Sequence, residues 1–242
     1  INQKDHSQGH ICPNTEKWLR LGPAGLRREA QAHYDAASDP EQQHFYRSVM
    51  LVMEGASHFM RRYADLAEQL YARHQDGNLK EIARICAKLA SASAESYHEA
   101  LQAAWFLYVI LQMEGNASSF SPGRMDQYLY PYFQASRENG MTLPEALELT
   151  EHLWLKFNQI VYLRNSNSAK YFAGFPIGFN VAIGGQRLDG TDASNELSYL
   201  FLQAQAHLLL PQPNLSLRVY KGSPEALLDM AKLHIPLVRN LV

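Results

Sequence analysis

Cysteine is scarce in this chain, with only Cys12 and Cys86 among 242 residues. Two cysteines cannot build the disulfide framework that holds small secreted domains together. Such low cysteine usage fits a reducing compartment, and we predict a cytoplasmic protein. Cys86 stands in a helical Ile-Cys-Ala context and Cys12 in His-Ile-Cys-Pro, so we interpret both as small packing residues.

An excess of charge of either sign is also absent. The chain has 22 Lys and Arg against 24 Asp and Glu, a net charge of −2. This balance gives no electrostatic attraction toward nucleic acid or an anionic membrane surface, so neither partner is predicted. Long apolar runs are missing too, because the most apolar segment, 103–111, has nine residues. A membrane-spanning helix needs about 20, so we expect a buried helix there.

Metal-ligand patterns are missing as well. The chain contains ten histidines, but none of them forms the H-E-x-x-H spacing of zinc peptidases, and no cysteine pair has zinc-binding spacing. The sequence therefore predicts no metal site.

The remaining composition is that of a globular protein, with 46% hydrophobic and 19% charged residues. This length suffices for one substantial core or two smaller ones. The chain starts at Ile1 in a polar stretch that does not have the pattern of a signal peptide. We interpret it as the interior of a longer protein.

Helix signals dominate the first two thirds of the chain. The tripeptide Asp39-Pro40-Glu41 supplies a cap, a proline at the first helical position and an acid near the positive helix end. Apolar residues at spacings of three and four extend this helix to about Arg73. Thr142 and Glu145 form a capping box that predicts a helix to about Leu163. Further helices are expected over 79–89, over 95–114, from an Asp192 cap to about Leu208, and after Ser223.

Two short segments, 179–183 and 215–220, alternate in the manner of strands. A helix of about 15 residues is expected between them, and a strand–helix–strand order is the pattern of a parallel α/β unit. The right-handed crossover rule also favours parallel pairing. We therefore predict an α/β fold, predominantly helical, in which these two strands lie side by side.

A more specific signal lies in residues 119–132, which read Ser-Phe-Ser-Pro-Gly-Arg-Met-Asp-Gln-Tyr-Leu-Tyr-Pro-Tyr. They resemble the Gly-Arg-x-Asp-Gln-Tyr-x-Tyr-Pro segment of glycyl radical enzymes, the family of pyruvate formate-lyase and its dehydratase relatives. The resemblance covers nearly the whole chain, and retention of this segment indicates the dehydratase-type branch. Further matches follow in the family's order at 145–164, 171–176, 183–186, 189–198 and 210–219.

This resemblance implies a partial glycyl-radical-enzyme α/β barrel, with residues 1–242 as the N-terminal to central portion of a single pyruvate formate-lyase-like domain. In the family a glycyl radical takes a hydrogen atom from a cysteine, and the thiyl attacks a substrate C–H bond. The radical is installed by an activase that uses S-adenosylmethionine and an iron–sulfur cluster. The implied partners are a small-molecule substrate, that activating enzyme and a second copy in a homodimer.

The radical machinery itself is not found in this sequence. Relatives usually show Gly-Cys-Val-Glu, or Cys-Cys in pyruvate formate-lyase, around the catalytic cysteine and Arg-Val-x-Gly-Tyr around the radical glycine. None of these motifs occurs here. We expect both loops beyond Val242, so no cofactor is predicted to bind this chain directly and no catalytic residue is assigned.

The resemblance does imply substrate-binding positions. His10 lies in Gly-His-x-x-Pro-x-x-Glu-Lys, a segment that contributes a polar group to the substrate in dehydratases, although a surface histidine near a chain end explains it equally. Ser118 and Ser119 stand where polyol dehydratases carry His-Ser. The missing histidine speaks against glycerol-type or propanediol-type activity. A serine turn that ends the preceding helix is the other interpretation of both residues.

Two further residues are candidates. Phe175 stands where relatives often carry an aromatic beside the pocket, and packing against Pro176 is the alternative. Arg218 shares a strand face with Ser216 and would point into a barrel. A buried Arg must be paired, so an internal ion pair is preferred over a substrate carboxylate. We predict that Ser119 and Phe175 line one concavity with His10 near it.

Arg124 and Asp126 are predicted to be structural. We expect the two side chains to form a charged pair that fixes their loop, after a turn at Pro122 and Gly123. Asp126 is expected to cap the helix that follows.

We therefore predict a portion of a glycyl radical lyase or dehydratase, similar to formate acetyltransferases. The complete enzyme would cleave C–O, C–N or C–C bonds of a small polar substrate, and this chain alone is predicted to be inactive. The alternative is a noncatalytic helical scaffold or interaction module derived from the same fold.

Overall fold

The computed structural model describes residues 10–115, 120–160, 167, 170 and 178–239, with side chains described through Leu233. The chain divides into two compact units. One unit comprises Ile1–Thr15 and Tyr108–Val242, and the other comprises Glu16–Leu107. Each unit is a body in its own right, and the functional residues predicted from the sequence all belong to the first.

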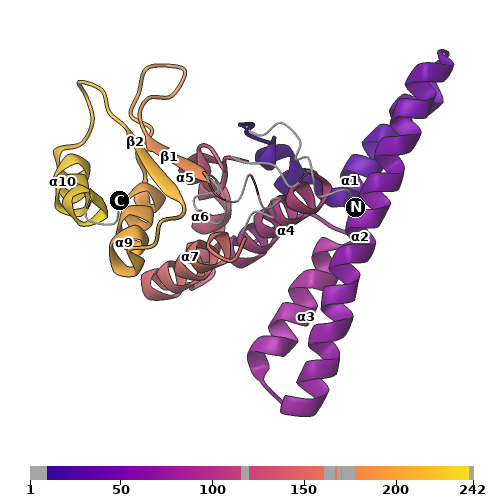
Figure 1. Ribbon diagram of the computed structural model, residues 1–242, viewed down its shortest axis with the longest axis horizontal. Coiled ribbons are helices and arrows are strands. Elements are labelled where there is room, and N and C mark those ends of the chain that lie inside the picture. The colour runs from indigo at the N-terminus through magenta and orange to yellow at the C-terminus, as the bar shows by residue number, and fades with distance from the viewer. Residues whose placement is uncertain (1–9, 116–119, 161–166, 168–169, 171–177, 240–242) are drawn as a thin grey trace. The chain divides into compact units, whose positions relative to one another are not determined.

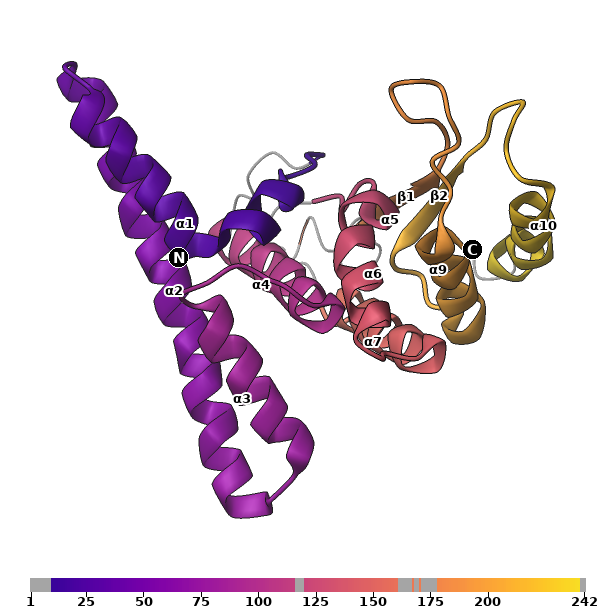
Figure 2. The same ribbon diagram turned by 180° about the vertical axis from the view of Figure 1, so that it is seen from behind.

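The unit formed by Glu16–Leu107 is helical throughout its regular structure. It contains most of α1 (Thr15–Ala36), all of α2 (Pro40–His74) and α3 (Gly77–Leu89), and the first part of α4 (Tyr97–Gly115). Helices α2 and α3 lie side by side as a helical hairpin (Figures 1 and 2). Small and apolar side chains face the interior of this hairpin: Ala56, Met60, Ala64, Ala67, Ile85, Cys86 and Leu89.

A buried carboxylate holds α3 to the start of α4. Glu99 is 2% exposed. Its oxygens accept hydrogen bonds from Lys88 Nζ at 2.8 Å and Arg84 Nη1 at 3.3 Å. The backbone amides of Glu95 and Ser96 donate to the same side chain at 2.9 and 3.3 Å. The cost of burying this charge is therefore offset by two cations and two amides.

The other unit contains α5 (Met125–Tyr128), α6 (Tyr130–Glu138), α7 (Leu143–Phe157), β1 (Asn180–Gly184), α9 (Glu196–Leu208), β2 (Asn214–Arg218) and α10 (Glu225–Arg239). Strands β1 and β2 pair in parallel, in a register that runs from Asn180 opposite Asn214 to Gly184 opposite Arg218. The predicted parallel pairing is confirmed, and α9 supplies the connecting helix (Figure 1). The expected α/β fold, predominantly helical, is confirmed as well.

An aromatic cluster forms the core of this unit. The rings of Phe157 and Phe179 stack with centroids 4.8 Å apart, and those of Trp154 and Phe201 lie 5.0 Å apart. Tyr108 packs edge-on against Phe157 and Phe179. All five side chains are fully buried, so α7, β1 and α9 share one apolar interior.

The helix starts were predicted correctly where the cap is local. The Asp39 carboxylate accepts from the amide of Glu41, and Thr142 and Glu145 form the expected reciprocal box. The start of α9 is different, because Asn195 and not Asp192 is its cap. Asp192 instead pairs with Gln186 in an antiparallel bridge. Helix α7 ends at Phe157 with Asn158 as its C-cap, so the expected extension to about Leu163 is wrong.

No helix in the described part of the chain is long and apolar enough to cross a membrane.

Candidate functional site

Residues 120–128 join the start of this unit to its sheet. Ile11 pairs in parallel with Phe120, and the amide of Ser121 donates to the Ile11 carbonyl at 2.8 Å. Three residues later Gly123 pairs with Val181 of β1. Its amide donates to the Asn180 carbonyl at 3.0 Å, and its carbonyl accepts from the Ala182 amide at 2.8 Å. The motif recognised in the sequence is therefore part of the sheet edge.

Arg124 holds the carboxyl end of β1. Its Nη2 donates to the Gly184 carbonyl at 2.9 Å, and its Nη1 donates to the Gln186 carbonyl at 3.3 Å. The expected ion pair with Asp126 is wrong, since none of the described ion pairs joins these two residues. The guanidinium finds its partners in backbone carbonyls that become available where the strand ends.

Asp126 binds the same strand end from within the core. The residue is fully buried. Its Oδ2 accepts from the Gly184 amide at 2.8 Å and from Ser198 Oγ at 2.7 Å. Burial raises the pKa of this carboxyl, against the lowering effect of its hydrogen bonds from Ser198 and Gly184. Asp126 lies inside α5 and does not cap the following helix, so that expectation is wrong.

Two more side-chain hydrogen bonds connect the 124–127 segment to the loop that follows β1. Gln127 Nε2 donates to the Ala193 carbonyl at 2.7 Å, and Asn195 Nδ2 donates to the Asp126 carbonyl at 2.8 Å. The loop between β1 and α9 is thus fixed at both ends by the 124–127 segment. Sequence reasoning missed these pairings, although both partners lie in segments that matched the family.

A group of buried hydroxyls lies behind the same segment. The hydroxyls of Thr15 and Tyr108 are 3.1 Å apart, and the Tyr128 hydroxyl donates to the Pro122 carbonyl at 3.1 Å. Burial raises the pKa of Tyr108 and of Tyr128. Both phenols therefore stay neutral and act as hydrogen-bonding groups.

The structure places two of the five predicted substrate-binding residues. His10 is exposed, has a positive φ of 61° and directly precedes the paired residue Ile11. Arg218 is exposed at the end of β2 and lies against Gly185, where an added Cβ would come 2.9 Å from the Arg218 Cβ. None of the described ion pairs includes Arg218, so the preferred internal pairing is not found in this part of the chain. The remaining three, Ser118, Ser119 and Phe175, lie outside the described residues.

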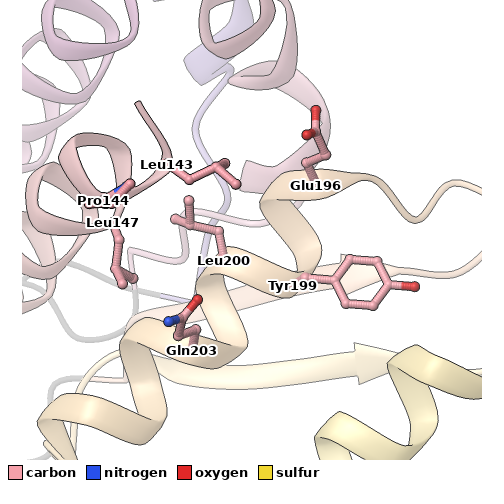
Figure 3. Close-up of a pocket in the computed structure, with 7 residues that line it drawn as sticks. All are labelled: Leu143, Pro144, Leu147, Glu196, Tyr199, Leu200 and Gln203. Atoms are coloured by element: carbon pink, nitrogen blue, oxygen red, sulfur yellow. The ribbon is translucent and has the colours of Figure 1, made fainter. Parts of the chain in front are cut away.

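A separate groove of about 490 Å³ lies between α7 and α9 (Figure 3). Apolar side chains dominate its lining, and the polar groups are Glu196, Tyr199 and Gln203. None of the predicted substrate-binding residues lines it. Among the described residues, no group of three or more His, Cys, Asp and Glu side chains could hold a metal ion.

Known proteins share both the sequence and this arrangement. The family described as Pyruvate formate lyase-like matches residues 1–234. The chain is 35% identical over 234 residues to the probable dehydratase YbiW of Escherichia coli (strain K12). The match covers 91% of this chain and 29% of YbiW. It is 35% identical over 224 residues to an isethionate sulfite-lyase of Nitratidesulfovibrio vulgaris, covering 87% of this chain and 27% of the relative.

The structural comparison agrees with the sequence comparison. The glycerol-bound form of the B12-independent glycerol dehydratase from Clostridium butyricum superposes with a TM-score of 0.88 at 36% identity. The match covers 93% of this chain and 30% of that chain. The 242 residues thus span less than a third of the length of these relatives.

Proposed function

The chain belongs to the pyruvate formate-lyase-like family of glycyl radical enzymes, in its dehydratase branch, and on that premise we propose that it is the N-terminal to central part of a longer radical lyase or dehydratase. The longer polypeptide cleaves a C–O, C–N or C–C bond of a small polar substrate. Residues 1–242 contribute scaffold and substrate contacts to one pyruvate formate-lyase-like domain of a cytoplasmic enzyme. A radical-installing activase and a second copy of the enzyme are its partners.

One observation carries this proposal. The pairing of Ile11 with Phe120 brings the residue after His10 beside the residue after Ser119. His10 and Ser119, which the family resemblance assigns to the substrate, directly precede these two paired residues in sequence, and this supports a shared role.

Each candidate side chain has a defined role in the proposal. His10 and Ser119 hydrogen-bond substrate hydroxyls, and His10 also assists proton movement. Phe175 covers the apolar side of the substrate, and Arg218 binds an anionic group on it. Ser118 in place of histidine removes a donor, so the substrate differs from glycerol or propane-1,2-diol.

The hydrogen-abstracting residues lie outside this chain in the proposal. A glycyl radical and a cysteine of the longer polypeptide supply that chemistry. Neither cysteine present here fits the role. Cys86 is buried on α3, where burial raises its pKa to about 11, and Cys12 packs against Gly123. A misplaced thiol is no substitute, because positioning supplies roughly 7–11 kcal/mol of such a barrier.

Anaerobic activation followed by electron paramagnetic resonance tests this proposal. The 242-residue chain and a C-terminally extended polypeptide are each treated with an S-adenosylmethionine-dependent iron–sulfur activase. We expect a glycyl doublet and substrate consumption only from the extended polypeptide. A doublet with turnover from the 242-residue chain would contradict the proposal, and a natural gene product that has no downstream radical motif would favour the noncatalytic scaffold.

A further inference from the structure

Cys12 and Gly123 make an unusually close contact. Gly123 has a φ of +70°, and a Cβ built on it would lie 2.5 Å from the Cys12 sulfur, with no other atom within 4 Å. Real Cβ atoms essentially never approach another atom so closely. The sulfur therefore occupies the space that any side chain at 123 would need.

This contact is one of three that residues 11–15 make with the rest of the unit, two of them with the 120–128 segment and one with Tyr108 of α4. The backbone pairing of Ile11 with Phe120 lies on one side of it. The hydrogen bond between Thr15 and Tyr108 lies on the other, at 3.1 Å. The backbone bond and the hydroxyl bond fix the two ends of this short stretch. The Cys12 sulfur lies between these two bonds in sequence and packs against Gly123.

The chemistry of the thiol agrees with a packing role. Partial burial raises the pKa of Cys12, so the group stays a neutral thiol at pH 7. A neutral thiol behaves as a small hydrophobe with only weak hydrogen-bonding capacity. Its described hydrogen bond is a long one, 3.9 Å to the Pro13 carbonyl.

We propose that Cys12 and Gly123 are a positioning pair for His10. The seating of the sulfur on the glycine sets the register of residues 10–15 against the Pro122–Tyr128 segment, and this register decides where the His10 imidazole stands. The inference rests on the proposed function, because it assigns the placement of a substrate-binding residue. Cys12 itself makes no contact with the reacting atoms.

The first experiment measures, without any substrate, whether residues 10–15 are docked on the 120–128 segment. The amide of Ser121 donates to the Ile11 carbonyl, so its hydrogen exchange in the 242-residue chain reports on whether residues 10–15 are docked. Gly123→Ala should speed this exchange about tenfold or more, since the methyl displaces the sulfur. Cys12→Ala/Gly123→Ala should restore slow exchange, because the double variant removes the atom that clashes.

Gly140→Ala is the matched control. Gly140 also has a positive φ, +97°, but a Cβ there meets nothing within 4 Å. This variant carries the backbone strain of the substitution without the clash, so Ser121 exchange should stay slow. Fast exchange in the double variant, or slow exchange in Gly123→Ala, would overturn the inference.

The second experiment uses the activated longer polypeptide with (2S)-3-sulfopropanediol and trans-4-hydroxy-L-proline, the substrates named for two relatives, as probes. Gly123→Ala should raise KM about as much as His10→Ala does. The double variant His10→Ala/Gly123→Ala should raise KM no more than either single variant. Cys12→Ala/Gly123→Ala should recover the wild-type KM. If the effects of Gly123→Ala and His10→Ala simply add, the positioning role is wrong while the proposed function stands. If the activated wild-type polypeptide forms no glycyl doublet, the proposed function falls and takes the role of His10 with it.

Discussion

The carboxylate of Asp126 accepts a 2.7 Å hydrogen bond from the hydroxyl of Ser198, although 72 residues separate the two in sequence. The same oxygen accepts from the Gly184 amide at 2.8 Å. Ser198 in turn accepts from the Asn195 amide at the start of α9. One buried oxygen thus links α5, the end of β1 and the cap of α9, and the local order of this part of the unit depends on it.

The first prediction is that Asp126 and Ser198 are energetically coupled. Asp126→Asn and Ser198→Ala should each lower the free energy of unfolding by roughly 1–3 kcal/mol. Ser198→Ala removes a donor to the buried carboxylate, and Asp126→Asn puts an amide nitrogen at the buried Oδ1 position, which has no described partner. The loss in free energy of unfolding in the double variant should be smaller than the sum of the two single losses by at least about 0.5 kcal/mol. Urea unfolding of wild type, the two single variants and the double variant measures this double-mutant cycle.

Asp229→Asn, at an exposed ion pair with Lys232, is the control and should change the free energy of unfolding by less than about 0.5 kcal/mol. Strict additivity would show that the two side chains act independently.

The second prediction concerns the pH dependence that Asp126 gives to stability. Its pKa in the folded protein is raised by burial above the ordinary value of 3.8. As pH rises from that value, the unfolded chain loses this proton before the folded protein does. The unfolded state then binds fewer protons, so the free energy of unfolding falls through this window. The stability of wild type relative to Asp126→Asn should therefore fall as pH rises through this window. A difference that grows with pH would refute this sign.

Glu99 should show the opposite sign. Burial alone would raise its pKa, but hydrogen bonds from Lys88, the Glu95 amide and Arg84 outweigh burial and lower it. Its contribution to stability is therefore present above the ordinary value of 4.5 and lost as pH falls through the lowered pKa.

Glu99→Gln should accordingly cost roughly 1–3 kcal/mol near pH 7 and progressively less in acid. Unfolding curves measured between neutral and acidic pH test this. Glu95→Gln is the control, since the side chain of Glu95 is 75% exposed although it also contacts Lys88. Equal losses in the two variants would show that burial of Glu99 is not what makes its interactions strong.

The sequence predicted those parts of the fold whose causes are local. The caps at Asp39 and Thr142 are decided by residues within one helical turn. The parallel pairing of β1 and β2 follows from the helix-length connection between them. In these cases the interaction partner lies within the window that a pattern can cover.

The missed features depend on partners that lie more than one helical turn away in sequence. Asp192 looked like a cap, but its pairing with Gln186 places it in the loop and leaves the cap to Asn195. Arg124 and Asp126 looked like a pair because they are close in sequence. Each instead binds groups about 60 residues or more away, at Gly184, Gln186 and Ser198. His10, Ser118, Ser119 and Phe175 came from the family resemblance alone, since no periodicity or spacing distinguishes His10 from an ordinary exposed histidine. Arg218 came from the alternation of its strand.

The last prediction concerns the break in α1. Gly22 has φ 61° and ψ 175°, and Pro23 follows it, so the helix is interrupted there. A Cβ at Gly22 would lie 2.7 Å from the carbonyl oxygen of Ala92. That oxygen belongs to the backbone, which cannot rotate away as a side chain would.

Gly22→Ala should therefore destabilise the chain by more than the roughly 1–3 kcal/mol that backbone strain alone costs a residue held at φ 61°, ψ 175°. The control is again Gly140→Ala, which has a positive φ and open space around its Cβ. Thermal and urea unfolding of both variants separate the two contributions, because the difference between them reports the clash with Ala92. If Gly22→Ala costs no more than Gly140→Ala, then the close approach of the Ala92 carbonyl does not require a glycine, and the kink of α1 depends on Pro23 alone.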